Sequence, residues 1–440
     1  MVQELPRRTV AARWAAPLVL LLISCRGEAR PTNEEAALTR TIDSLRPSVE
    51  RTVGLNFKRH PKARMVDRAE AAAFIQRNLA TQMGGGRAQH LASAYRLLGL
   101  LPDTLDLARL LGNVLAEQVA GYYDPKTATF YGVRGAGKVG YVLTVSHELV
   151  HALQDDYLPL DSIQDATGDA DRLLAAQAML EGQATLAMMR MNPEIGDRAL
   201  TPEFWEQIRE GLKGQQQQMP QLTAAPRLVR EALTFPYFSG AEYMRWWVTT
   251  HPADRQPYGA DMPRSSEQIL APERVARGDV PLTVTFVGAP VASYSDGLGA
   301  AETRLLLAEA RGQEELIDPA VLGWGGDRFE LYATPQGDAL VWIAVFDSPP
   351  AREGALRALA EWPKARSGFA RRLEPLEVGG KAGLRLVVAP AGWERWSALP
   401  AATAAPENKL RVSRLSSLVS RQLLLPPDAA PHGIPHHDRQ

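Results

Sequence analysis

Hydrophobic positions in the first half of the chain follow the spacing of helices. Apolar residues recur three and four positions apart, as in LASAYRLLGLL, which is typical of helices that bury one face. Helices are predicted at 34–53, 68–82, 88–120, 169–190, 201–214 and 228–249. The stretch TATFYGV at 127–133 predicts a short strand, because it is rich in β-branched and aromatic residues and follows an Asp-Pro turn.

The pattern changes from about Pro281, where strands and helices alternate. LTVTFV and GLRLVVAP predict the first and last strands, AAETRLLLAEA and AREGALRALAEW predict helices, and RFELYATPQGDALVWIAVF predicts a hairpin between them. The order β-α-β-β-α-β is that of a ferredoxin-like fold. We therefore expect an α+β protein with a mostly helical domain followed by a smaller α+β domain of ferredoxin-like topology.

The first residues have the features of a secretory signal. Three arginines precede the apolar run APLVLLLIS, which is too short to span a bilayer as a mature helix. It ends in LISC, which resembles the lipobox of bacterial lipoproteins, so Cys25 is predicted to carry a lipid that anchors the protein to a membrane of the bacterial cell envelope, facing the periplasm or the exterior. The alternative is a free thiol beside an ordinary signal peptide.

These patterns divide the chain into six parts. We expect a signal peptide at 1–24, a tether at 25–36, the helical domain at 37–278, the α+β domain at 279–398, a linker and terminal helix at 399–425, and a disordered tail at 426–440.

Composition narrows the class of protein. The 440 residues are 45% apolar and 22% charged, which is ordinary for globular proteins and excludes a fibrous or disordered chain. The net charge is −1, and no block of lysine and arginine interleaves with aromatic residues, so no nucleic-acid partner is expected. Cys25 is the only cysteine, which excludes an intramolecular disulfide.

The stretch TVSHELVHALQDD contains a candidate metal site. His147 and His151 fit the pattern H-E-x-x-H and would lie about 40° apart on one face of a helix. Their rings could therefore converge on one ion, while Glu148, about 100° away, would point beside the ion as a general base for water. The alternative is an amphipathic helix with two partly buried histidines.

A third ligand must come from elsewhere, because catalytic zinc commonly takes three protein ligands. Glu181 in MLEGQATLAMM is preferred, because it lies among apolar and small residues where an unpaired carboxylate would be costly to bury. The small residues Gly182 and Ala184 would let this helix approach the histidine helix. The alternative for Glu181 is an exposed helix edge. The weaker ligand candidates are His251, Glu242 and Asp156.

H-E-x-x-H followed by a helical glutamate resembles the gluzincin metallopeptidases. The resemblance implies a zincin-like domain in which His147, His151 and Glu181 hold one zinc ion and Glu148 activates water. It also implies an edge strand before the metal helix that receives a peptide or protein substrate in extended form, and TFYGV is in that position. The chain departs from the pattern at Thr185, where some gluzincins place an aspartate that orients a histidine.

A wider resemblance covers most of residues 110–345. EQVAGYYDP, HELVHALQDD, LEGQAT, PRSSEQIL and WGGDRFELY together resemble a group of secreted bacterial lipoproteins of unassigned function. No match to an oxyanion-stabilising motif is found. Tyr237, Tyr243 and Arg245 in FPYFSGAEYMRWW are candidates for that role, with packing of a buried helix as the alternative.

The sequence thus predicts a membrane-anchored zinc metallopeptidase. Two alternatives remain open. One is a lipid-anchored binding or assembly factor of the envelope whose zinc site is structural or vestigial. The other is a zinc hydrolase that acts on cell-wall amides.

Overall fold

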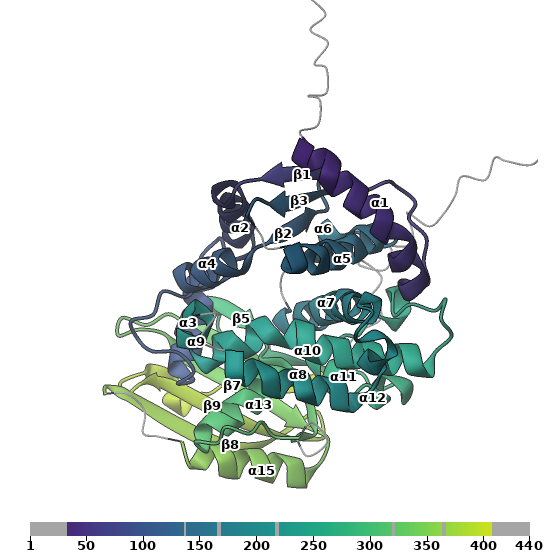
Figure 1. Ribbon diagram of the computed structural model, residues 1–440. Coiled ribbons are helices and arrows are strands. Elements are labelled where there is room, and N and C mark those ends of the chain that lie inside the picture. Colours follow the sequence, from purple (N-terminus) through teal and green to yellow (C-terminus); the bar gives the residue numbers. More distant parts are fainter. Residues whose placement is uncertain are drawn as a thin grey trace, which may run out of the picture.

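The computed structural model describes residues 33–135, 138–164, 169–215, 220–318, 322–362 and 367–406. Over these residues the protein is a mixed α+β structure, 53% helical and 19% strand, in which a helical part with a small sheet adjoins a larger sheet (Figure 1). The predicted signal peptide, Cys25, the terminal helix and the tail lie outside the described residues. No helix in the described ranges has the length and apolar character needed to cross a bilayer.

The first half contains the predicted helices and, in the described ranges, several short helices that were not predicted from the sequence. These are α1 (Asn33–Val53), α2 (Arg68–Gln82), α3 (Arg87–Leu97), α4 (Leu107–Gln118), α5 (Lys138–Asp155), α6 (Leu160–Gln164), α7 (Ala170–Met191), α8 (Pro202–Gln215), α9 (Pro220–Ala224), α10 (Arg227–Thr250), α11 (Ser266–Leu270) and α12 (Glu273–Ala276). The prediction of a single helix at 88–120 is wrong, because the chain turns between α3 and α4. Gly99 adopts a left-handed conformation with φ +68° just after α3, which ends the helix.

Three short strands form a small sheet in this half. They are β1 (Lys62–Val66), β2 (Gly121–Asp124) and β3 (Thr129–Val133), in the order β1-β3-β2. The strand TFYGV is therefore the central strand, and the expectation that it forms an edge is wrong. The edge strand nearer to α5 is β2, which runs antiparallel to β3 and contacts α5.

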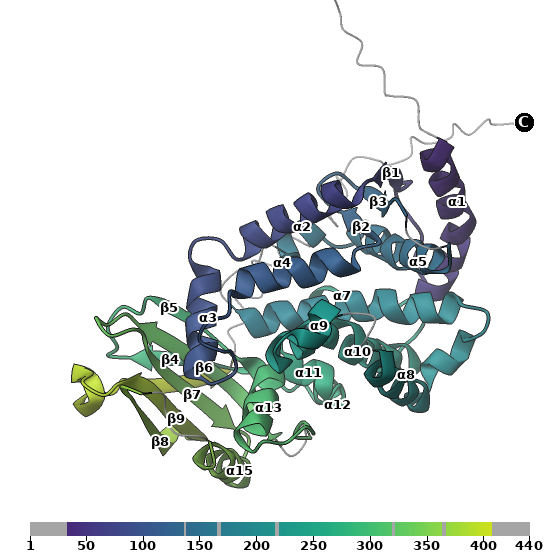
Figure 2. The ribbon, with the colours of Figure 1, turned by 60° about the vertical axis from the view of Figure 1, so that its left-hand side comes forward.

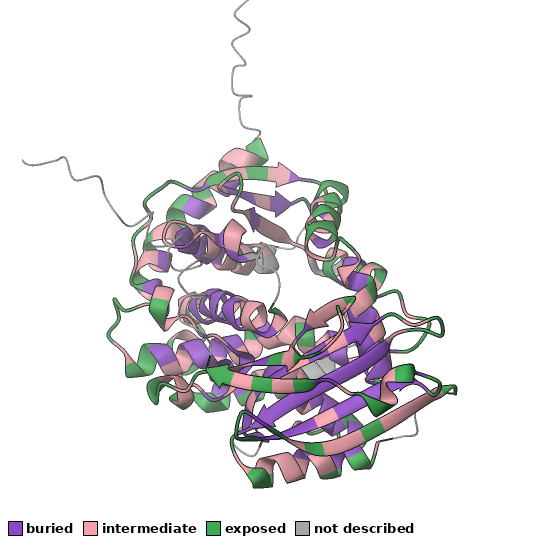
Figure 3. Ribbon diagram, turned by 180° about the vertical axis from the view of Figure 1, so that it is seen from behind, coloured by how far each residue is buried: buried purple, intermediate pink, exposed green. Residues whose placement is uncertain are grey.

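The second half is built on a five-stranded antiparallel sheet. Its strands are β5 (Tyr294–Asp296), β6 (Trp324–Tyr332), β7 (Ala339–Phe346), β9 (Lys381–Pro390) and β8 (Phe369–Val378), in that order. Helices α13 (Gly299–Ala310) and α15 (Pro349–Ala360) pack on one face. Every residue of the central strand β7 is buried (Figure 3). Its side chains alternate between two core clusters on opposite faces.

The ferredoxin-like topology is wrong for two reasons. The first predicted strand, β4 (Leu282–Val287), lies outside the main sheet and pairs with β10 (Ala401–Pro406), a segment expected within a linker. In addition, β8 joins the sheet as an edge strand although its sequence FARRLEPLEV contains four charged residues and a proline. An edge strand is paired on one side only, so it tolerates charged residues and Pro375, which conceals it from pattern analysis.

The two halves share a core. The largest cluster of buried side chains combines α3 and α4 with α13, α15 and the main sheet, so its residues lie on both sides of the boundary expected at 279. Helices α2 and α4 run side by side from the small sheet toward α3 (Figure 2). The histidine helix α5 and the Glu181 helix α7 lie in the first half, on the side of the small sheet.

Candidate metal centre

Helix α5 presents both histidines of the H-E-x-x-H motif on one side and packs its other side into a core. Val145, Leu149 and Leu153 are fully buried in a cluster with α1 and β3. The side chains of His147 and His151 are 13% and 14% exposed, so they are partly shielded but open on one side. The 3.6-residue period of the helix thus places both imidazoles on one side of α5, opposite the side that packs into the core.

Helix α7 brings Glu181 to the two histidines. Its carboxylate oxygen Oε2 lies 3.0 Å from Nε2 of His147 and 3.3 Å from Nε2 of His151. The two imidazole nitrogens are 3.2 Å apart. Within the described ranges this is the group of histidine, cysteine and acidic side chains close enough to hold a metal ion. The structure therefore brings together the three ligands predicted from sequence.

Gly182 and Gly240 allow α7 to pack closely on α10, whereas the sequence predicted that Gly182 would face the histidine helix α5. Gly182 faces α10 rather than α5, and a Cβ added to it would lie 2.1 Å from the carbonyl carbon of Gly240. Ala184 faces the α5 side, where it is fully buried in the same cluster as Leu149. The glycine pair thus allows α7 and α10 to touch, and Ala184 allows α7 to approach α5.

Glu148 lies beside the cluster and is held by the edge strand β2. The backbone N–H of Tyr123 donates to Glu148 Oε2 at 2.8 Å. Burial raises the pKa of Glu148, while the neighbouring imidazoles and the Tyr123 N–H partly oppose the rise. A carboxylate with a raised pKa is a better proton acceptor, which suits a general base. The sequence did not indicate the contact with Tyr123.

The electrostatics of the cluster favour a cation. Burial lowers the pKa of His151, but the Glu181 and Glu148 carboxylates outweigh burial and raise it to about 9. Burial raises the pKa of Glu181, but the two imidazoles have the larger combined effect and hold it well below its ordinary value. The raised pKa of His151 follows from the negative potential that two converging carboxylates create, and the same potential attracts a metal ion.

Gln154 is an additional site residue that sequence reasoning missed. Its Oε1 lies 2.8 Å from Nδ1 of His151, the ring nitrogen that faces away from Glu181. Gln154 is fully buried. The sequence did contain a signal for this contact, because Gln154 follows His151 by three positions and residues with that spacing are neighbours on a helix face.

The two tyrosine candidates lie in different places. The ring of Tyr237 stacks against His147 with centroids 6.0 Å apart, and the residue is 41% exposed. The charge of Glu181, burial and the charge of Glu148 raise the pKa of Tyr237 well above its ordinary value, so its hydroxyl stays a donor. Tyr243 is separated from Tyr237 by about 120° around α10 and is fully buried in a core cluster. In the described part of the chain, no contact joins Tyr243 or Arg245 to the metal-ligand cluster.

The weaker ligand candidates have partners elsewhere. His251 stacks on Trp247, Glu242 pairs with Arg209 at 2.6 Å, and Asp156 pairs with Arg59 at 2.6 Å. Two further histidines also lie apart from the cluster: His60 pairs with Asp43, and His90 stacks on Tyr294.

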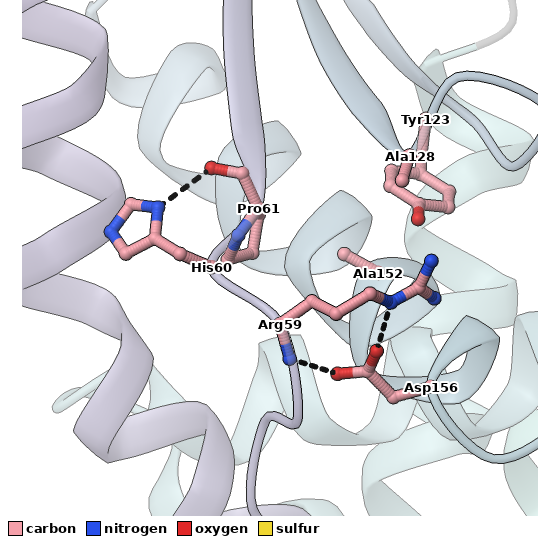
Figure 4. Close-up of a pocket in the computed structure, with 7 residues that line it drawn as sticks. All are labelled: Arg59, His60, Pro61, Tyr123, Ala128, Ala152 and Asp156. Atoms are coloured by element: carbon pink, nitrogen blue, oxygen red, sulfur yellow. Dashed lines mark hydrogen bonds and ion pairs between the residues drawn. The ribbon is translucent and has the colours of Figure 1, made fainter.

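A small pocket lies beside the last turns of α5 (Figure 4). Arg59 lines the pocket and pairs with both Asp155 and Asp156, and the hydroxyl of Tyr123 also donates to Asp155. The charged groups of the pocket thus satisfy one another. They fasten the segment before β1 and the edge strand β2 to the end of α5.

Comparison with known proteins identifies no family for this chain. No protein-family model matches the chain, and no curated protein matches it. A crystal structure from Chloroflexus aurantiacus, described as that of "a putative hydrolase with a novel fold", aligns over 57% of this chain and 92% of its own, with 17% sequence identity and a TM-score of 0.33. At that similarity it carries no argument about fold or activity.

Proposed function

We propose that this protein is a zinc-dependent peptidase in which His147, His151 and Glu181 hold one zinc ion. The observation that carries the proposal is the spacing of the three ligand atoms, 3.0, 3.2 and 3.3 Å. Tetrahedral zinc with bonds of 2.0–2.1 Å places neighbouring ligand atoms about 3.3 Å apart. Two imidazole nitrogens and one carboxylate oxygen are also the donor types that zinc prefers.

Three protein ligands support a catalytic role over a structural one. Structural zinc sites are commonly closed by four protein ligands, and catalytic sites keep one position open. Among the described residues, no fourth histidine, cysteine or acidic side chain belongs to the cluster. For that reason the peptidase is favoured over a binding or assembly factor with a structural zinc site.

In the proposed reaction, Glu148 is the general base. Zinc, when bound, supplies Lewis acidity that polarises a carbonyl oxygen and makes water more acidic. Glu148 accepts a proton from the water that attacks the carbonyl carbon and returns it to the amine nitrogen as the C–N bond breaks. The Tyr123 N–H holds one oxygen of the carboxylate, which orients Glu148 for both transfers.

Tyr237 is the proposed donor to the carbonyl oxygen as negative charge develops on it. Its position against His147 and its strongly raised pKa support a protonated hydroxyl at the edge of the site. Tyr243 is not proposed for this role, since it is buried in the core.

The edge strand β2 is proposed to align the substrate. It ends the small sheet on the side of α5, and an edge strand offers backbone groups to an extended peptide. Recognition of this kind depends on main-chain pairing, so it would accept many peptide sequences. A cell-wall amide would be cleaved by the same chemistry and is an outcome of the test below.

We further propose that Cys25 carries a lipid that anchors the protein in the bacterial envelope. The support is the LISC sequence after a basic and apolar leader. Membrane fractions of cells that express the wild-type protein and Cys25→Ala test it. Unchanged membrane attachment of the variant would exclude the anchor.

The decisive experiment combines metal analysis with peptide-library cleavage. Wild type and Glu148→Gln are both expected to bind one zinc ion per chain, and only the wild type should cleave peptides. His432, His436 and His437 near the end of the sequence are further metal-binding side chains, so the zinc content is measured against His147→Ala, which should lose the ion of the site. Absence of stoichiometric zinc in the wild type would overturn the proposal. Full activity of Glu148→Gln would remove its assignment as the base, and cleavage of cell-wall fragments alone would change the substrate class.

A further inference from the structure

A chain of three glutamines, of which Gln154 and Gln183 are buried, runs from His151 to the end of α1. Gln154 Nε2 donates to Gln183 Oε1 at 2.9 Å, and Gln183 Nε2 donates to Gln256 Oε1 at 2.7 Å. Gln256 Nε2 then donates to the backbone carbonyl of Val53 at 2.8 Å. At the other end, Gln154 Oε1 faces Nδ1 of His151.

The hydrogen bonds along these three glutamines can run in one direction only. A backbone carbonyl can only accept, so Gln256 must present its NH₂ group to Val53 and its oxygen to Gln183. The same logic passes along the chain and orients the amides of Gln183 and Gln154. The carbonyl of Leu180 orients Gln154 independently, because it accepts from the same Nε2 at 2.9 Å.

The orientation of Gln154 determines the tautomer of His151. Because Gln154 turns an oxygen to Nδ1, the His151 ring must carry its proton there. When the ring is neutral, as it is when it binds a metal, the electron pair is therefore on Nε2, the nitrogen that faces Glu181 Oε2 and His147 Nε2. A neutral imidazole binds a metal through such an electron pair.

We infer that Gln154, Gln183 and Gln256 are positioning residues that hold His151 in its metal-binding tautomer and ring orientation. The relay joins α5, α7, the segment after α10 and the end of α1, so it ties the ligand to four separate parts of the fold. Gln154 is fully buried and Gln183 is 4% exposed. A buried amide that lost a partner would leave an unsatisfied polar group, which makes the relay cooperative.

Tyr258 reinforces the middle of the relay. Its hydroxyl donates to Gln183 Oε1 at 2.5 Å, so that oxygen accepts two hydrogen bonds and cannot turn away without losing both. Thr185, on the same helix, differs. It is 5% exposed and its hydroxyl has no hydrogen-bond partner, which makes it a matched control of a buried polar group outside the relay.

The inference rests on the metal site of the proposed function, and its test separates the two. Zinc affinity is measured by chelator competition at one pH for the wild type, Gln154→Leu, Gln183→Leu and Thr185→Val. Gln154→Leu should bind zinc about 10- to 100-fold more weakly, the usual effect of losing an outer-shell partner. Gln183→Leu should show a smaller loss, and Thr185→Val none.

A second measurement reports the tautomer directly. In protein labelled with ¹⁵N-histidine and loaded with zinc, the Nδ1 proton of His151 should be protected from exchange with water in the wild type. The protection should disappear in Gln154→Leu and persist in Thr185→Val, and Gln183→Leu keeps the test informative if Gln154→Leu does not fold.

The outcomes separate as follows. The inference would be overturned if Gln154→Leu kept wild-type zinc affinity and a protected Nδ1 proton, and the peptidase proposal would remain intact. If Gln154→Leu does not fold, the same result in Gln183→Leu would overturn the inference. A wild type that binds no zinc would overturn both the peptidase proposal and the positioning role, since the latter requires a bound metal.

Discussion

Gly182 and Gly240 are in backbone contact where α7 crosses α10. A Cβ added to Gly240 would lie 1.9 Å from the carbonyl oxygen of Ala178, closer than real Cβ atoms approach such a neighbour. Gly182 directly follows Glu181, and Gly240 lies about one turn after Tyr237 on α10. The contact between the two glycines therefore also determines how closely the proposed zinc ligand and the proposed oxyanion donor approach.

Gly240→Ala is expected to destabilise the fold. The added methyl group must push two backbones apart, and overpacking of this kind costs about 1–3 kcal/mol in the free energy of unfolding. Urea denaturation measures the loss. The matched control is Gly354→Ala in α15, where nothing lies within 4 Å of an added Cβ, so the variant should be about 0.5–1 kcal/mol more stable than the wild type. Equal stability of the two variants would contradict the close contact.

Glu181→Gln is expected to weaken zinc binding strongly. The amide keeps the size of the side chain but removes the charge that faces both histidines, so the loss should exceed the about 10- to 100-fold effect of outer-shell changes. Chelator competition measures it. Glu242→Gln on α10 is the control, because this carboxylate has a similar exposure but pairs with Arg209. The ligand assignment is wrong if both variants bind zinc alike.

Tyr237→Phe is expected to lower kcat about 10²- to 10³-fold, as loss of an oxyanion donor does, with little change in zinc affinity. The comparison is Tyr243→Phe, whose hydroxyl is buried without a hydrogen-bond partner. Removing that hydroxyl should leave kcat unchanged and stability equal or higher. Steady-state kinetics of peptide cleavage distinguish the two, and an unchanged kcat in Tyr237→Phe would exclude Tyr237 as the donor.

The stability of the protein is expected to fall between about pH 4.5 and pH 8. Burial raises the pKa of Glu302, the hydrogen bond from Tyr95 opposes the rise, and the folded value is about 8 against an ordinary 4.5. A raised pKa means that the folded state holds the proton more tightly, so this stabilising contribution is complete below the unfolded pKa and is lost as the pH rises through the folded pKa.

Glu302→Gln tests this pH dependence, because the amide oxygen can still accept from Tyr95. At about 1.4 kcal/mol per pKa unit, discounted for partial exposure, the group accounts for on the order of 2–4 kcal/mol between pH 5 and pH 8. Urea unfolding at both pH values, with zinc held constant, should show a smaller difference for the variant. Part of the slope should remain, since burial also raises the pKa of Glu267 to about 8. An unchanged slope would contradict the assignment to Glu302.

Local spacing in the sequence was enough to predict the longer helices of the first half, apart from the turn between α3 and α4, and the shared face of His147 and His151. Both depend on the 3.6-residue period, which acts within one segment. The burial argument that selected Glu181 was also local, because a carboxylate among apolar and small residues needs a partner. The structure places that partner 34 residues away along the chain.

Other features depended on contacts between distant segments and could not be deduced from either segment alone. The partner of LTVTFV is a strand more than one hundred residues later, and the edge strand beside Glu148 is β2 rather than TFYGV, because a third strand, β1, covers the other side of TFYGV. Gly182 has the small size that close packing needs, but only the tertiary structure decided that it faces α10. The amide relay behind His151 likewise arises only when α1, α5 and α7 pack together. A side chain's own segment determines which face it occupies, whereas its partner on that face is determined by the packing of the whole chain.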